Sequence, residues 1–74
     1  MRTTFDPEAD AAYIYLVPVI EPGRSVRTLE VPDVDGGMVV LDFDAEGILL
    51  GVEVIGARNL LDPMLLADAE RIDA

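Results

Sequence analysis

The segment from Asp42 to Ala57 reads D-F-D-A-E-G-I-L-L-G-V-E-V-I-G-A, and it constrains the fold more than any other part of the chain. It has an acidic start, a glycine at Gly47 and then a run of aliphatic residues. The flanking residues 38–41 and 54–56 are good strand sequences and poor helix sequences. Gly47 can adopt the positive φ that a tight hairpin turn requires. The segment is therefore predicted to form a β-hairpin.

The same segment also fits the pattern of a twelve-residue calcium loop. Counted from Asp42, carboxylates fall at loop positions 1, 3, 5 and 12, with Gly47 at position 6. These carboxylates belong to Asp42, Asp44, Glu46 and Glu53. Helices must enter and leave an EF-hand loop, whereas strand sequences flank this one. We favour the hairpin and keep a carboxylate-based calcium site as the alternative.

Other strand signals lie on both sides of this hairpin. Runs rich in β-branched and aromatic residues, separated by Pro- and Gly-containing turns, indicate short strands. The expected strands cover residues 2–5, 12–17, 25–31, 38–43 and 48–55. The predicted fold class is α+β: one domain over residues 1–74, with a small antiparallel sheet of about five strands in a hairpin meander and one C-terminal helix.

The expected helix begins after Asp62, a good N-cap, with Pro63 in the first helical position, where its missing N–H costs nothing. Leu61 and Leu66 have the spacing of a hydrophobic staple. Apolar residues then continue at helical spacing: Leu65, Ala69 and Ile72. We interpret this helix as a packing element.

Several features predict that the protein self-associates. A domain of 74 residues without Cys has no disulfide to stabilise a small core. The strand over residues 12–17 has apolar residues on both faces: Tyr13 and Tyr15 on one, Ile14 and Leu16 on the other. One short helix can cover only one face of a sheet, so a second subunit is expected to cover the other. We expect a homo-oligomer, a dimer or higher.

Charge limits the choice of partner. The net charge is −10, with 15 acidic residues against five basic ones, all of them arginine. Such a surface repels phosphate backbones and anionic lipids, and it can attract a basic protein. We expect no nucleic-acid or membrane partner. No signal-peptide pattern and no long apolar run are visible, so the expected location is cytoplasmic.

The usual catalytic machinery is missing from the sequence. His, Cys and Lys are absent, so Ser25 and the few threonines have no side chain to activate them. Asp42 with Asp44 or Glu53 could form an acid/base pair. We favour plain surface charge, or Glu53 paired with an arginine such as Arg27 or Arg58. No enzyme activity, catalytic residue, cofactor-binding residue, cofactor or metal site is therefore predicted.

Two blocks of the chain resemble a known family. Residues 6–16 read D-P-E-A-D-A-A-Y-I-Y-L, and residues 42–57 read D-x-D-x-E-G-x-x-x-G-x-E-x-I-x-A. Together they resemble the short bacterial proteins of domain-of-unknown-function family 2283. Ala12, Glu46 and a longer loop over residues 32–37 depart from the family pattern. The resemblance implies a small antiparallel sheet with a C-terminal helix and carries over no site residues. Members are often suspected of being antitoxins beside a small basic partner.

These observations lead to one functional hypothesis and two alternatives. The hypothesis is a non-enzymatic protein-binding module, antitoxin-like, acting through homo-oligomeric or hetero-protein interfaces. The first alternative is a structural homo-oligomer without a regulatory role. The second is the calcium-binding protein built on Asp42, Asp44, Glu46 and Glu53.

Overall fold

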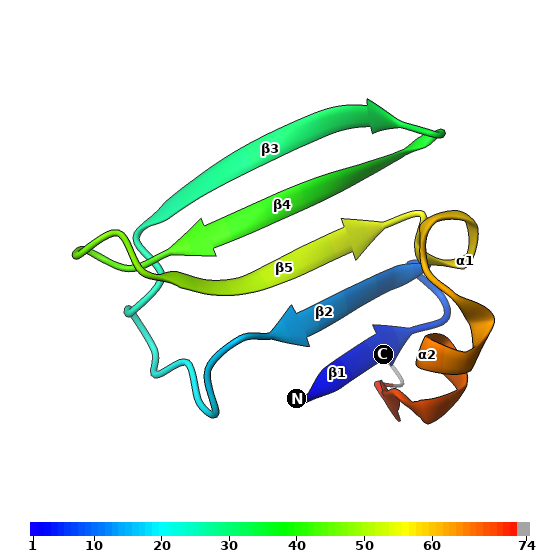
Figure 1. The fold of residues 1–74 in the computed structure, drawn as a ribbon, viewed down its shortest axis with the longest axis horizontal. Helices are drawn as coiled ribbons and strands as arrows, with labels where there is room; N and C mark the ends of the chain where they lie inside the picture. The colour runs from blue at the N-terminus through cyan, green and yellow to red at the C-terminus, as the bar shows by residue number, and fades with distance from the viewer. Residues whose placement is uncertain (73–74) are drawn as a thin grey trace.

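The computed structural model describes residues 1–72 as one sheet with two short helices at one end (Figure 1). Within these residues the sheet has six strands rather than about five, and there are two helices rather than one. In chain order the elements are β1 (Thr3–Asp6), β2 (Ala11–Tyr15), β3 (Arg27–Val34), β4 (Gly37–Phe43), β5 (Leu49–Ile55), α1 (Ala57–Leu60), α2 (Pro63–Asp68) and β6 (Glu70–Arg71). The mixed, mostly β architecture is compatible with the predicted α+β class.

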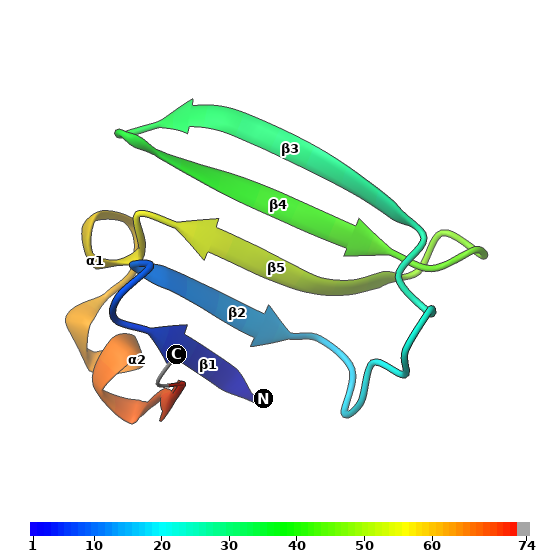
Figure 2. The ribbon, with the colours of Figure 1, turned by 180° about the vertical axis from the view of Figure 1, so that it is seen from behind.

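The predicted meander is wrong in one essential respect. The strand order is β3-β4-β5-β2-β1-β6, so β2 pairs with β5 and not with β3. The chain leaves β2 after Tyr15 and crosses the end of the sheet to begin β3 at the opposite edge, as both views of the ribbon show (Figures 1 and 2). Two prolines and a glycine lie in this connection, which is too long for the tight turn of a hairpin.

The hairpin interpretation of the Asp42 segment is confirmed. Strands β4 and β5 pair antiparallel, with Leu41 opposite Val52 and Val40 opposite Glu53. The turn between them closes where the Asp44 amide donates to the Ile48 carbonyl at 3.0 Å, and Gly47 has φ +84°. These elements are strands, so the helices that an EF-hand requires are not found on either side of this turn.

Strand β3 is longer at its end than predicted. It continues through Pro32 to Val34, with a bulge in its pairing to β4 between Val31 and Val34. Proline is tolerated here because β3 is an edge strand and its pairing is irregular at this point. Asp35 and Gly36, both with positive φ, form the tight turn into β4.

The C-terminal helix begins as predicted but ends early. The Asp62 carboxylate accepts a hydrogen bond from the Met64 amide at 2.8 Å, and Pro63 occupies the first turn. The helix stops at Asp68, and Glu70–Arg71 forms β6, parallel to β1, so helical packing of Ile72 was a wrong expectation. The backbone of β1 explains why the helix ends here. The Phe5 carbonyl on β1 accepts a hydrogen bond from the Ile72 amide at 2.9 Å, so the chain after α2 runs along this strand.

Strand pairing defines two faces of the sheet. The helix face is the one on which Leu60, Leu61 and Leu66 pack against the buried cluster. Its members are Phe5, Ala12, Ile14, Arg27, Leu29, Val31, Val39, Leu41, Phe43, Val52 and Val54. The opposite one, the tyrosine face, contains Thr4, Tyr13, Tyr15, Thr28, Glu30, Val40, Asp42, Gly51 and Glu53.

Neither helix in the part of the chain that the structure covers is long and apolar enough to cross a membrane.

Candidate functional site on the tyrosine face

A hydrogen bond between Tyr13 and Asp42 organises the tyrosine face. The Tyr13 hydroxyl on β2 donates to the Asp42 carboxylate on β4 at 2.8 Å, across the intervening strand β5. Gly51 of β5 lies beneath, and a Cβ there would collide with the Tyr13 ring. Tyr15 meets Tyr13 edge-on, with ring centroids 4.9 Å apart. The absence of a side chain at Gly51 therefore lets the tyrosine cross β5 and reach the carboxylate.

The environment of Tyr13 favours its neutral form. Partial burial, followed by the hydrogen bond to Asp42 and the negative charge of that carboxylate, raises the pKa of Tyr13. A phenol with a raised pKa is a poor general base and a poor nucleophile at neutral pH. The arrangement is therefore suited to holding β2 and β4 together and to offering aromatic surface.

We expect stability to fall above about pH 10, the pKa of a tyrosine in an unfolded chain. Above that pH the unfolded chain loses the Tyr13 proton while the folded chain keeps it, so unfolding is favoured as pH rises. Denaturant titrations from about pH 8 to about pH 11 measure this loss. Tyr13→Phe removes the group and should reduce the pH dependence, whereas an equal dependence in both proteins would contradict it.

Asp44 has a structural role in the β4–β5 turn. Its carboxylate accepts hydrogen bonds from the backbone amides of Glu46 at 3.0 Å and Ile48 at 2.9 Å. It also accepts one at 3.4 Å from the side chain of Arg24, which lies in the connection between β2 and β3. The Ile48 amide does most to lower the pKa of Asp44, against the opposing effect of burial, with help from the Glu46 amide and Arg24. The carboxylate therefore stabilises the turn and links the β2–β3 connection to it.

The carboxylates considered for calcium do not gather at one point. Asp42 lies opposite Gly51, and Glu53 lies opposite Val40, so these two carboxylates are diagonal neighbours on the tyrosine face. Asp44 is buried in the turn, and Glu46 is exposed at its tip. Over residues 1–72, no group of three or more potential metal-ligating side chains is found. The geometry thus brings together only one pair of the four, Asp42 and Glu53.

The suggested ion pair of Glu53 with an arginine is not present. Arg27 extends over the Phe43 ring, 4.6 Å from its centroid, on the helix face. Arg58 pairs with Asp10 at 3.4 Å. Glu53 is on the other face from Arg27 because side chains alternate along a strand and the register is set by the hairpin.

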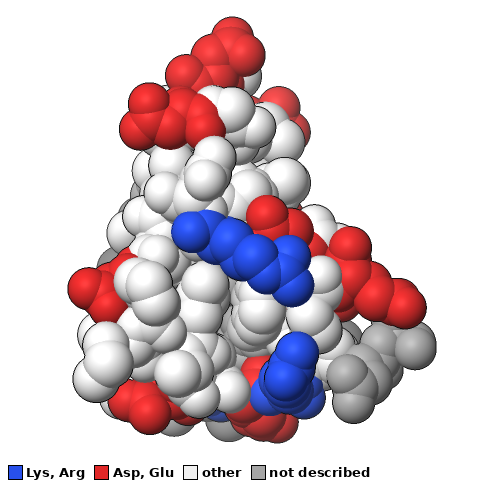
Figure 3. Space-filling view, turned by 90° about the vertical axis from the view of Figure 1, so that its right-hand side faces the viewer, with Lys and Arg blue, Asp and Glu red and all other residues white. Residues whose placement is uncertain are grey.

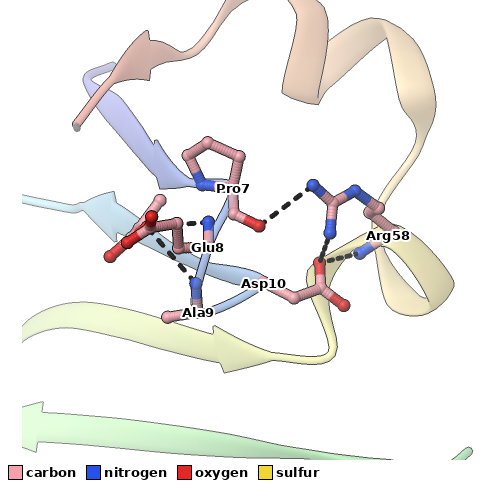
Figure 4. A network of polar contacts seen from close by, with 6 residues as sticks. Pro7, Glu8, Ala9, Asp10 and Arg58 are labelled. Atoms are coloured by element: carbon pink, nitrogen blue, oxygen red, sulfur yellow. Dashed lines mark hydrogen bonds and ion pairs between the residues drawn. The ribbon is translucent and has the colours of Figure 1, made fainter. Parts of the chain in front are cut away.

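Residues 6–10, which belong to the first of the two blocks that resemble the family, form the β1–β2 turn and contact α1 (Figure 4). Asp6 accepts the Glu8 and Ala9 amides and shapes the β1–β2 turn. Asp10, at φ +51°, accepts the Arg58 amide at 3.0 Å, and the Arg58 side chain donates to the Pro7 carbonyl at 3.1 Å. We did not predict these contacts. The adjacent Gly56, at φ +82°, was a sequence signal for the bend that brings α1 to this turn.

Acidic side chains are divided unevenly between the two faces. Every acidic residue that occupies a paired strand position within residues 1–72 lies on the tyrosine face of the sheet. These residues are Asp6, Glu30, Asp42, Glu53 and Glu70. The exposed Asp33 and Asp35 add charge beside the β3–β4 turn. One face of the sheet is therefore acidic, while the charged paired positions on the other are arginines.

A shallow cavity of about 360 Å³ lies between α2 and β1. Its lining residues are Phe5, Arg58, Pro63, Leu66, Ala67, Ala69 and Arg71. Figure 3 shows the side of the molecule on which the helices lie: basic side chains border uncharged surface, and acidic residues surround them. Because Arg58 is already held by Asp10 and the Pro7 carbonyl, we interpret this cavity as part of the packing between α2 and the sheet.

Comparison with known proteins places the chain in a family. The profile of the family described as "Protein of unknown function (DUF2283)" matches residues 2–58, which include β1 to β5 and the start of α1. Searches of curated proteins and of solved structures found no match. The matched region contains both the Asp6–Asp10 turn and the Tyr13–Asp42–Gly51 arrangement. Since the match covers most of the chain, the protein belongs to the DUF2283 family.

Proposed function

We propose that this protein is a cytoplasmic, non-catalytic binding module that captures a basic protein partner on its tyrosine face, in the manner of an antitoxin. The observation that carries the proposal is the gathering of acidic strand residues on one face. The chain has a net charge of −10, and this arrangement concentrates part of that negative charge on one side of the sheet. A face of one sign attracts a partner of the opposite sign and orients it during approach.

The same face also offers contact area. Tyr13 and Tyr15 are partly exposed and rigidly placed, with Arg2 over the Tyr15 ring at 4.6 Å. Tyrosine is enriched at binding surfaces because its ring is apolar and its hydroxyl is polar. Glu53, directly opposite Tyr13, is partly exposed on β5, and Glu30 is exposed on the edge strand β3 of the same face. Acidic groups around an aromatic centre suit a basic protein surface. The suspected antitoxin role of family members also supports this choice of partner.

Affinity purification with a matched pair of variants tests the proposal. We expect the tagged chain to capture a basic protein from its native host in about 0.05 M salt and to release it near 1 M salt, where the Debye length is about 3 Å. Glu30→Lys reverses a charge on the tyrosine face and should slow association of the purified partner about tenfold. Asp68→Lys makes the same change on α2 and should leave association within about twofold.

Two outcomes would reject this function. The first is capture that persists at high salt and is equally strong for both variants, because the binding surface would then lie elsewhere. The second is a captured partner with no excess of basic residues. Circular dichroism of each variant confirms that the charge reversal has not unfolded the chain.

A further inference from the structure

The helix face is only partly covered by the rest of the chain. Side chains from α1, α2 and the residues between them pack over Phe5, Ala12 and Val54, at the β1–β2 side of the sheet. On the β3–β4 side, Leu29 and Val31 are 47% and 45% exposed. We call this apolar area the open patch. It consists of the exposed Leu29 and Val31 and the partly buried Val39, Leu41 and Phe43, with Arg27 over the Phe43 ring.

The open patch leaves the protein with an incomplete core. Among residues 1–72, only six hydrophobic side chains are buried, and Leu29 and Val31 of the patch are two of the ten large ones that are exposed. Contiguous exposed apolar area on a small domain marks a contact surface more often than isolated exposed residues do. A domain of this size, without a disulfide, gains stability from burying such an area against a partner.

The distribution of acidic residues favours a second copy of the chain as the partner that covers the open patch. No acidic residue occupies a paired strand position on the helix face within the described chain, although the net charge is −10. A basic partner would find no carboxylate to pair with there. A second copy would bring an equally apolar, acid-free surface, so two highly negative chains can meet here without opposing carboxylates. We propose that the open patch is the interface of a homodimer in which two helix faces pack against each other, rather than the face opposite the helix that was expected from the sequence.

The area of the helix face limits how tightly two copies can bind. The molecule measures 33 × 26 × 21 Å and has an accessible surface of 4827 Å². One broad face is about a fifth of such a body, roughly 1,000 Å², and a stable interface needs about 800 Å² from each partner. Because the helices take part of this face, we expect a dimer with a dissociation constant in the micromolar range. Its two tyrosine faces point outward, so the dimer does not depend on the proposed basic partner.

A pair of variants on one strand tests the assignment. Sedimentation of the wild-type chain at about 100 μM, well above a micromolar dissociation constant, should give twice the 8.0 kDa chain mass. Leu29→Glu places a charge in the patch and should weaken the dimer about a hundredfold while the exposed position keeps the fold intact. Thr28→Glu makes a similar addition on the opposite face of β3 and should leave the dimer in place. A monomeric wild type, a dimer unaffected by Leu29→Glu, or equal loss in both variants overturns the proposal.

Cross-linking keeps the proposal testable if Leu29→Glu fails to fold. The chain contains no Cys, so a single introduced thiol reports only its own surroundings. Leu41→Cys lies within the patch on β4, whereas Thr28→Cys places the thiol on the tyrosine face of β3. A short bifunctional maleimide should join two copies through Cys at position 41 and not through Cys at position 28. Efficient joining through position 28 alone would reject face-to-face packing.

Discussion

Leu50→Ala is expected to lower the free energy of unfolding by about 2–5 kcal/mol, the usual range when a fully buried leucine is truncated. Leu50 is 0% exposed and is the largest side chain to be completely buried in the part of the chain that the structure describes. Truncation removes apolar contacts and leaves a cavity that the surrounding strands fill only in part. Since small domains have about 5–15 kcal/mol of stability, the variant should be near the limit of folding at room temperature.

Chemical denaturation followed by circular dichroism measures this effect, with all proteins at one concentration so that self-association does not alter the comparison. Ile48→Ala is the matched control, because Ile48 is 51% exposed and only two residues away. It should cost less than about 1 kcal/mol. Equal losses in the two variants would contradict the burial of Leu50.

Gly51→Ala is expected to destabilise the protein by about 1–3 kcal/mol through overpacking. A Cβ at this position would collide with the Tyr13 ring and push it away from Asp42. The substitution would otherwise favour folding, because glycine weakens a strand interior. The expected sign therefore comes from the tertiary contact and opposes the intrinsic preference of the strand.

A double-mutant cycle isolates this contact. In the background Tyr13→Ala, the space above Gly51 is open, so Gly51→Ala should be neutral or slightly stabilising. The coupling energy between the two positions should be about 1–3 kcal/mol, measured as the difference in unfolding free energy. If Gly51→Ala costs the same in both backgrounds, Tyr13 does not rest on Gly51, and the tyrosine face is built differently.

Local sequence patterns correctly predicted the β4–β5 hairpin and the start of α2, because contacts between residues close in sequence determine both. The β4–β5 hairpin follows from two strand-type runs joined by Asp44 and Gly47, and its turn closes through contacts within five residues. The start of α2 follows from Asp62 and Pro63. The residue types at the turn and at the helix start were sufficient to predict these elements, because capping and turn geometry depend on neighbouring residues.

The tertiary structure decided which strands meet and which side chains share a face. Nothing in β2 itself indicates that it pairs with β5, since its apolar residues could pair with several strands. The same non-local choice brings Tyr13 to Asp42, ends α2 so that β6 can join β1, and separates Arg27 from Glu53. The acidic residues could be counted from the chain, but their gathering on one face depends on register. A sheet combines segments distant in sequence, and a shift of one residue moves a side chain to the other face.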